Sequence, residues 1–313
     1  MTAIITSPLF LQHCSPSTHP ECKERITAIC EALKEAKLFE QYLIPPRYAS
    51  EEELMLCHNQ PYIDLVKKEA AELHARPAFL STGDVLINQH SFDIARLAAG
   101  AVLTACDAVM EKRAQNAFCV VRPPGHHACT SRGMGFCIFN NVAIGARYVQ
   151  KRYGIERVLI VDFDVHHGNG TQEIFNNDPS VFYFSTHDKD NYPGTGHEHE
   201  RGLGQAIGTK MNVPFSNGPH ARDTIYNAFT TLATAMKAFS PQFVFISAGF
   251  DAHKEDPLGR SCLTEEDFFA LTKAIRDIAH TYAQDRLVSV LEGGYNLSAL
   301  ARSAVQHVRA LQG

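Results

Sequence analysis

Short runs of β-branched and aromatic residues alternate along this chain with longer segments of helical periodicity, and this alternation constrains the fold more than any other feature. Each run is apolar throughout and is bounded by turn residues, which is typical of a strand buried on both faces. The predicted strands are residues 3–6, 117–121, 158–162, 181–185, 211–215, 243–247 and 287–291.

The segments between these runs carry apolar residues at the spacing of amphipathic helices. They span residues 91–110, 141–153, 223–239, 264–282 and 297–311. We expect Ser91 to cap the first helix, and Thr264 with Asp267 forms the pattern of a capping box at the fourth. Buried strands that alternate with helices predict a parallel sheet covered by helices on both faces. We therefore expect one α/β domain over residues 1–313.

The composition argues against several classes of protein. Lys and Arg number 29 against 34 Asp and Glu, a net charge of -5, so we expect no direct binding to nucleic acid. The N-terminus lacks the basic segment and apolar core of a signal peptide, and no stretch reaches the ~20 apolar residues of a membrane span. The nine cysteines include no Cys-x-x-Cys pair, which argues against a disulfide framework. We expect a cytoplasmic protein, with a nuclear or host-delivered location left open and no prediction of oligomeric state.

Polar loops follow five of the predicted strands. RPPGHH, DFDVHH, STH, AGFD and EGGY each lie at or just after the carboxyl end of a different strand. In open parallel sheets the carboxyl ends of the strands meet at one edge, which is where ligands bind. The sequence therefore predicts an active site at that edge.

The DFDVHH loop has the residues of a metal site. Asp162, Asp164 and His166 alternate along an extended segment, so all three can face the same side. Asp164 and His166 offer a carboxylate and an imidazole, and Asp251 after another strand can supply a third ligand. Two carboxylates and one histidine with an open position suit a catalytic Zn²⁺. The alternative is that these residues only tie loops together, which is the better reading for either aspartate taken singly but not for all three.

The tandem pair His126-His127 is suited to proton transfer. An imidazole titrates near neutrality and can take a proton from water and return it to a leaving amine. The preceding Pro-Pro-Gly turn would hold both rings rigidly, and each ring needs a partner for its other nitrogen. Asp162, left outside the metal ligands, is the candidate partner for one ring. The alternative is that one histidine merely caps a helix.

Three aromatic residues beside glycines complete the candidate site. Tyr295 follows Gly-Gly, which allows its phenol to approach a substrate and donate to a developing oxyanion. An ordinary turn tyrosine is the alternative. Phe136, after Gly135, and Tyr192 are candidate walls of a narrow tunnel, although each motif alone is a weak signal.

Seven motifs taken together resemble the zinc-dependent histone deacetylase family, within the arginase/deacetylase superfamily. They run in consistent order from His19 to Tyr295 and so cover nearly the whole chain. HPEC with Arg25, and the HHGNGTQ form of the metal loop, resemble the class II branch. The motifs are HPEC (19–22), RPPGHHA (122–128), GFCIFNN (135–141), DFDVHHGNGTQ (162–172), YPGTG (192–196), SAGFDAH (247–253) and LEGGY (291–295).

The resemblance implies the arginase/deacetylase fold and a hydrolase that converts ε-N-acetyl-lysine in a protein or peptide to lysine and acetate. It places Zn²⁺ on Asp164, His166 and Asp251. His127 would be the general base and then the general acid, and His126 beside Asp162 would support the transition state. Tyr295 would polarise the acetyl carbonyl together with the metal.

The resemblance also assigns residues to substrate and to potassium. Phe136 and Tyr192 would grip the aliphatic lysine stem, and the Gly135 carbonyl would accept a hydrogen bond from the substrate amide. The family also binds a structural K⁺. By position, one such site would use Asp162, Asp164, His166, Ser185 and Thr186.

Two residues depart from related patterns. Asn169 stands where class I members have an aspartate partner for His127, and class II-like members share the asparagine. Leu258 stands where polyamine-specific relatives carry a glutamate, which favours acetyl-lysine over an acetylpolyamine as substrate.

Three other functions are less favoured. An acetylpolyamine amidohydrolase is the nearest alternative. An arginase-like enzyme with two manganese ions would need a carboxylate in place of Gly168. A non-catalytic acetyl-lysine-binding protein would usually have lost Tyr295 or a histidine of the tandem pair, and all are present.

Overall fold

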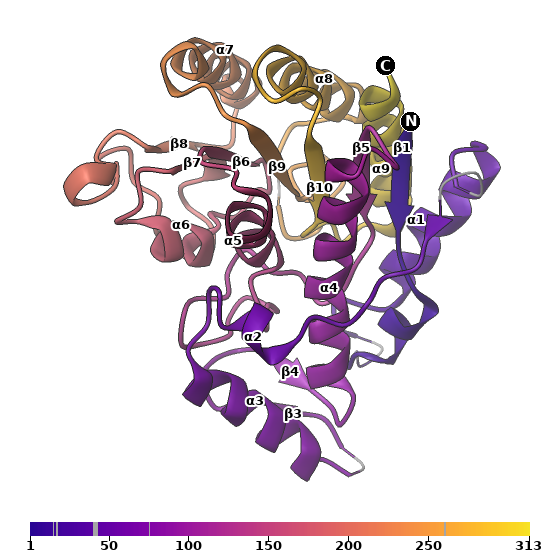
Figure 1. Cartoon of the computed structure of the whole chain (residues 1–313). Coiled ribbons are helices and arrows are strands. Elements are labelled where there is room, and N and C mark those ends of the chain that lie inside the picture. The colour runs from indigo at the N-terminus through magenta and orange to yellow at the C-terminus, as the bar shows by residue number, and fades with distance from the viewer. Residues whose placement is uncertain (15, 17, 40–42, 75, 260) are drawn as a thin grey trace.

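The predicted apolar strands form one parallel sheet in a computed structural model, which describes residues 1–14, 16, 18–39, 43–74, 76–259 and 261–313 (Figure 1). The eight strands lie in the order β2-β1-β5-β10-β9-β6-β7-β8. They are β1 (Thr2–Ile5), β2 (Leu43–Ile44), β5 (Asn116–Cys119), β6 (Val158–Asp162), β7 (Val181–Asp188), β8 (Lys210–Phe215), β9 (Phe243–Ala248) and β10 (Leu287–Leu291). A separate antiparallel pair joins β3 (Ala78–Phe79) to β4 (Leu86–Ile87).

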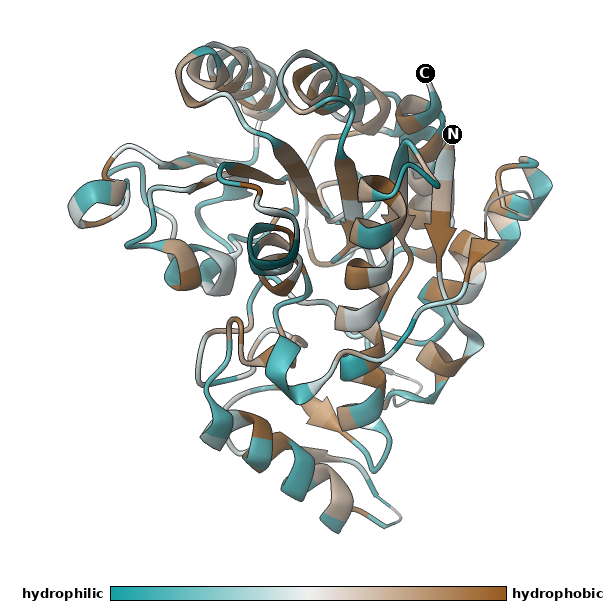
Figure 2. Ribbon diagram, in the orientation of Figure 1, coloured by the Kyte–Doolittle hydropathy of each residue, from teal (hydrophilic) through white to brown (hydrophobic). Residues whose placement is uncertain are grey.

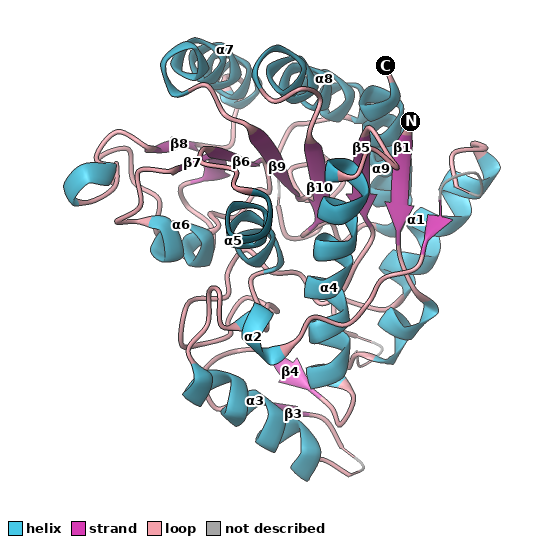
Figure 3. Ribbon diagram, in the orientation of Figure 1, coloured by secondary structure: helices cyan, strands magenta, loops and turns pink. Residues whose placement is uncertain are grey.

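Helices cover both faces of this sheet, as Figure 3 shows. Helices α4 and α5 pack together on one face, and α1, α9, α8 and α7 contact one another in succession on the other. The helices are α1 (Glu24–Glu35), α2 (Glu51–Leu54), α3 (Gln60–Glu72), α4 (Ser91–Met110), α5 (Asn141–Tyr153), α6 (Asn169–Phe175), α7 (Ala221–Phe239), α8 (Glu265–Tyr282) and α9 (Leu297–Gln312). The predicted α/β class with a parallel sheet between helices is therefore confirmed. None of the helices in the described part of the chain is long and apolar enough to span a bilayer.

One predicted helix cap is wrong and one is confirmed. The residue that precedes α4 is His90, and Ser91 is already inside the helix. The Ser91 hydroxyl accepts the backbone N–H of Asn88 at 2.8 Å, so it closes the preceding turn instead of capping the helix. Thr264 does precede α8, and its backbone N–H donates to the Asp267 carboxylate at 2.9 Å.

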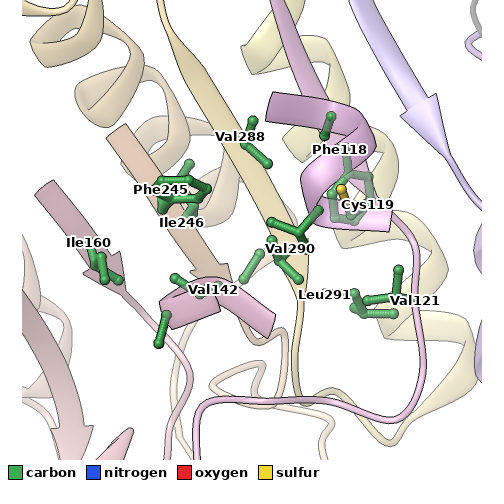
Figure 4. Packing of buried hydrophobic residues seen from close by; sticks show 14 of the residues in the cluster. Phe118, Cys119, Val121, Val142, Ile160, Phe245, Ile246, Val288, Val290 and Leu291 are labelled. Carbon is green, nitrogen blue, oxygen red and sulfur yellow. The ribbon is translucent and has the colours of Figure 1, made fainter. Parts of the chain in front are cut away.

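The core lies between the sheet and its helices. The strands are among the most hydrophobic parts of the ribbon in Figure 2, while the helices carry hydrophilic residues as well. Figure 4 shows Val142 of α5 beside Phe245 of β9 and Val290 of β10, and all three are fully buried. Because the central strands are mostly apolar on both faces, the residues of the predicted site lie at the strand ends.

The chain order reverses in the middle of the sheet, and this reversal positions the candidate site. The connection from β5 to β6 passes over two positions that β10 and β9 fill later in the chain. The carboxyl ends of β5, β10, β9 and β6 are therefore neighbours. In an open α/β sheet, a ligand is expected to bind in the crevice where the strand order reverses in this way.

Candidate active site

The three predicted metal ligands converge at the carboxyl ends of β6 and β9. His166 Nδ1 lies 3.0 Å from Asp164 Oδ1 and 3.0 Å from Asp251 Oδ2. One ligand atom from each residue lies within 4.8 Å of the other two, and all three residues are buried. Among the residues described, no other group of three or more His, Cys, Asp or Glu side chains meets this spacing.

Charge and donor type both fit a divalent cation at this cluster. Burial, together with the negative charge of Asp164, raises the pKa of the Asp251 carboxyl above its usual range. Burying two carboxylates beside one imidazole costs the folded protein free energy unless a positive charge lies between them. The set of two oxygen ligands and one nitrogen ligand suits Zn²⁺.

Backbone hydrogen bonds orient these ligands, and a glycine makes the close approach possible. The N–H of Gly293 donates to Asp164 Oδ2 at 2.8 Å, and the N–H of Val165 donates to Asp251 Oδ1 at 2.9 Å. A Cβ atom at Gly293 would lie 2.0 Å from Asp251 Oδ2, which no side chain tolerates. Gly293 therefore allows the loop after β10 to pack directly against both carboxylates.

The tandem histidines each have one ring nitrogen fixed by a partner. His126 Nδ1 lies 3.0 Å from Asp162 Oδ2, as the sequence predicts, and His127 Nδ1 lies 2.8 Å from Asn169 Oδ1. Both partner oxygens can only accept, so each Nδ1 carries a hydrogen. Asp162 also accepts the Tyr183 hydroxyl at 3.0 Å. The Nε2 atom of neutral His127 is therefore left to accept a proton.

The two adjacent imidazoles have opposite electrostatic environments. Burial alone lowers the pKa of His126, but the neighbouring carboxylates, Asp162 foremost, outweigh it and raise that pKa to about 10. Burial and the positive charges of His126 and His166 lower the pKa of His127 well below its usual range. The pair therefore combines a cationic ring with a neutral one, with ring centroids 4.0 Å apart.

Glu292 is a buried carboxylate that the sequence analysis did not assign. Its Oε2 accepts the N–H groups of Gly125 and His126 at 2.7 and 3.1 Å, and its Oε1 accepts the Ser247 hydroxyl at 3.2 Å. Burial raises its pKa to about 7. Glu292 thus links the end of β10 to the turn that carries the tandem histidines. Only its position in EGGY, beside Tyr295, could have drawn attention to it.

Tyr295 faces the same pocket from the loop after β10. Its ring centroid lies 6.1 Å from that of Phe136, and the guanidinium carbon of Arg25 lies 5.1 Å from it. Burial raises the pKa of the Tyr295 phenol well above its ordinary value. The hydroxyl therefore stays protonated and able to donate.

The pocket above the cluster has a volume of about 240 Å³. The predicted residues Gly135, Phe136, Tyr192 and Leu258 all line it, and Leu258 is 37% exposed. Phe136 and Gly135 both have left-handed backbone conformations (φ 67° and 56°). A Cβ atom at Gly135 would lie 2.3 Å from His127 Cδ2, so the wall contacts the catalytic candidate directly.

Asp84 lines the same pocket and was missed by the sequence analysis. It lies between β3 and β4, and its Oδ1 accepts the N–H of Gly135 at 2.8 Å. The segment around it has no apolar periodicity and no motif, so nothing in the sequence joined Asp84 to residues about fifty positions away.

The residues predicted to hold potassium lie on adjacent strands. Asp162 of β6 pairs in register with Ser185 of β7, and Thr186 follows Ser185 on the same strand. All three are buried. This placement is compatible with the predicted site, which stays a prediction.

Known proteins show the same architecture and sequence pattern. The family model described as histone deacetylase domain matches residues 19–311. The chain is 37% identical to "Histone deacetylase 10, chloroplastic" of Oryza sativa subsp. japonica, over 94% of this chain and 70% of that protein. It is 39% identical to "Polyamine deacetylase HDAC10" of Danio rerio, over 95% of this chain and 45% of that protein.

A solved structure gives the same result in three dimensions. The crystal structure of the HDA15 HD domain superposes with a TM-score of 0.91 at 36% sequence identity, and covers 100% of this chain and 91% of that one. The resemblance drawn from the seven motifs is thereby confirmed, as are the arginase/deacetylase fold and the hydrolase class. The chain belongs to the histone deacetylase family.

Proposed function

We propose that this chain hydrolyses ε-N-acetyl-lysine in proteins or peptides to lysine and acetate, with a bound zinc ion. One observation carries the proposal. A neutral His127 and a protonated Tyr295 line one small pocket together with His166 of the Asp164-His166-Asp251 cluster, and a cationic His126 packs against His127. Water attack on an amide needs a base, a positive charge and an oxyanion donor, and these groups supply all three.

Asp164, His166 and Asp251 would hold the zinc ion. When bound there, Zn²⁺ lowers the pKa of the attacking water and polarises the substrate carbonyl. The ligand atoms are already oriented by backbone N–H groups of Val165 and Gly293, so little rearrangement is needed for binding.

The tandem histidines divide the proton chemistry. His127 Nε2 takes a proton from the attacking water because its Nδ1–H is committed to Asn169. The same nitrogen then returns that proton to the lysine amine as the carbon–nitrogen bond breaks. His126, held cationic beside Asp162, stabilises the negative charge that develops on the acetyl oxygen. The Tyr295 hydroxyl donates a hydrogen bond to that oxygen.

The aromatic walls of the pocket suit an uncharged aliphatic stem. Phe136 and Tyr192 offer aromatic faces for the four methylene groups of lysine, and the carbonyl of Gly135, which also lines the pocket, would accept the substrate amide N–H. Leu258 offers no charge to a polyamine. An acetylpolyamine is the second candidate substrate, because the zebrafish relative is named a polyamine deacetylase.

We further propose that Asp162, Asp164, His166, Ser185 and Thr186 hold a structural K⁺.

The experiment compares acetate release from an acetyl-lysine peptide and from an N-acetylated polyamine. Both substrates are offered to zinc-loaded protein and to protein stripped by a chelator. We expect zinc-dependent turnover of the peptide. Turnover of the polyamine alone would replace the proposed substrate class, and peptide turnover that survives metal removal would refute the role of zinc.

Tyr295→Phe tests the proposed mechanism at one atom. Loss of one preorganised oxyanion donor lowers kcat by about 10²–10³-fold in other enzymes, and we expect a loss of that size here. Zinc content should stay equal to that of the unmodified protein, since Tyr295 is not among the ligands. Unchanged turnover would refute the oxyanion role.

A further inference from the structure

One carboxylate joins the loop that carries Leu258 to the loop that carries Tyr295. Asp256 Oδ1 accepts the backbone N–H groups of Leu258 and Gly259 at 2.9 and 3.1 Å. Its Oδ2 accepts the N–H groups of Tyr295 and Asn296 at 2.7 and 3.3 Å. Asp256 is only 6% exposed, so these four bonds are little weakened by water.

The loop before Tyr295 needs such an anchor. Gly293 and Gly294 precede it, and Gly294 adopts a φ of 118° that other residues rarely reach. Two consecutive glycines leave the backbone free to take many conformations, so the position of the phenol depends on what holds the loop. Arg25 fixes one side by donating to the Gly294 carbonyl at 2.6 Å, and Asp256 fixes the other side at the Tyr295 N–H.

The same carboxylate also ties Tyr295 to the mouth of the pocket. The turn from Asp256 to Gly259 presents Leu258 at the opening. The Leu258 carbonyl in turn accepts the Asn191 side chain at 3.2 Å, next to Tyr192. A substrate that enters past Leu258 therefore meets Tyr295 at a separation set by one side chain.

We propose that Asp256 is a positioning residue that fixes the Tyr295 hydroxyl at the substrate carbonyl, relative to the mouth of the pocket. This inference rests on the proposed function, because it assigns Tyr295 its role as the oxyanion donor. Asp256 reaches Tyr295 through the main chain and touches no reacting atom. Its removal should therefore affect kcat far more than substrate binding.

Asp256→Asn is the first test. An asparagine forms the same local turn, so its oxygen keeps the Leu258 and Gly259 bonds. Its NH₂ group then faces the N–H groups of Tyr295 and Asn296, where donor meets donor. A displacement of about 1 Å can cost about 10²-fold in rate, so we expect kcat to fall by at least about tenfold. KM should stay within about threefold and zinc content should not change.

Asp256→Ser is the second test and serves if the asparagine variant does not fold. A serine hydroxyl still accepts N–H groups two and three residues ahead, but it is too short to reach Tyr295. Only the bonds from the N–H groups of Tyr295 and Asn296 are lost, so we expect the same fall in kcat as in Asp256→Asn. A rise in KM with kcat unchanged would show that Asp256 positions only the loop at the mouth of the pocket, and would overturn the proposal.

A spectroscopic measurement makes the test independent of turnover. In protein labelled with 3-fluorotyrosine, ten tyrosines give ¹⁹F signals, and the signal missing in Tyr295→Phe identifies Tyr295. That signal should shift in both Asp256 variants. An unchanged Tyr295 signal together with kcat within about twofold of the unmodified protein would overturn the proposal. If the unmodified protein releases no acetate, the proposed function fails, and the ¹⁹F signal still decides the positioning.

Asp267→Asn is the matched control. Asp267 is likewise a buried carboxylate that accepts backbone and side-chain donors, here Thr264 N–H and the Tyr226 hydroxyl at 2.9 and 2.7 Å. It caps α8 and does not line the pocket. We expect lower stability and a shifted Tyr226 signal, with the Tyr295 signal and kcat unchanged. A control variant that loses kcat as well would show that any buried carboxylate matters equally, which would overturn the specific role of Asp256.

Discussion

At the scale of single residues, the partner of His127 decides how this site responds to pH. Asn169 holds the His127 Nδ1–H without adding a negative charge, while burial and the positive charge of His126 lower the pKa of His127. His127 is therefore unprotonated well into the acid range. A family member with an aspartate in this position would have a more basic His127.

Asn169→Asp should move the acid limb of the pH–rate profile to higher pH. A carboxylate 4–6 Å or less from an imidazole typically raises its pKa by about 1–3 units, so His127 would be protonated, and inactive as a base, over a wider range of acid pH. The measurement is kcat/KM for acetate release from pH 5 to 9. Asn176→Asp, just after the same short helix, is the control and should leave the profile in place. An unmoved limb in Asn169→Asp would show that His127 is not the titrating base.

Gly293→Ala should abolish metal binding while the fold is retained. The new methyl group would lie 2.0 Å from Asp251 Oδ2 and 2.6 Å from Asp164 Oδ2, so both ligands must move. Bound zinc per protein measures the effect. Gly154→Ala is the control, because Gly154 has a φ of 68° but no atom within 4 Å of the added carbon. That variant should lose about 1 kcal/mol of stability from backbone strain and keep its zinc.

At the scale of elements, one buried charge cluster fastens the start of α1 to two strand ends. Glu21 accepts two hydrogen bonds from Arg122, after β5, at 2.7 Å each, and one from Arg25 of α1 at 3.1 Å. Arg25 also donates to the carbonyls of Glu292 and Gly294 after β10. Three segments that carry or support catalytic candidates thus share one anchor.

Glu21→Gln should destabilise the protein by about 3–5 kcal/mol, because it leaves two buried guanidinium groups without their counter-charge. Arg25 and Arg122 are both fully buried, so water cannot compensate. Urea denaturation measures the loss. Asp277→Asn removes one partner of the exposed Lys273–Asp277 pair on α8 and should cost no more than about 0.5 kcal/mol. Similar losses in the two variants would contradict the role of burial.

At the scale of the whole molecule, buried neutral histidines should make the fold sensitive to acid. Burial lowers the pKa of His13, His187 and His307 to about 3 and that of His58 to about 4, against 6.5 when unfolded. The unfolded chain therefore binds more protons, and the stability these groups provide is complete above pH 6.5. It is lost as pH falls from 6.5 toward the folded pKa values, by about 1.4 kcal/mol per pH unit for each histidine.

Urea unfolding measured from pH 7.5 to 5 checks this prediction. Stability should fall steeply below pH 6.5, and the slope should be smaller in His307→Leu by about one proton. His307 bonds Thr272 of α8 and Ser289 of β10 at 2.7 and 2.8 Å, so the variant also loses stability at neutral pH. A slope identical to that of the unmodified protein would show that His307 is already protonated in the folded state.

Local patterns made several parts of this molecule predictable. Strands buried on both faces leave continuous apolar runs, so β6 and β10 have the predicted bounds and α4 begins and ends as expected. The helix cap at Ser91 was misplaced by one residue because cap geometry depends on side-chain bonds that periodicity does not encode. The two-residue strands β2, β3 and β4, and short helices such as α2 and α6, are too brief to produce a period.

The sequence by itself determined the fold class, the residues of the candidate metal site and the edge of the sheet where they gather, because each depends on a strand and the few residues that follow it. Tertiary structure alone decided which loops meet. The order β5-β10-β9-β6 brings together segments more than a hundred residues apart. It thereby gives Glu292 its backbone partners, whereas the partners of Asp84 and Asp256 come from segments 51 and 39 residues away. Each of these carboxylates bonds N–H groups that become its neighbours only when the chain is folded, and no local pattern records them.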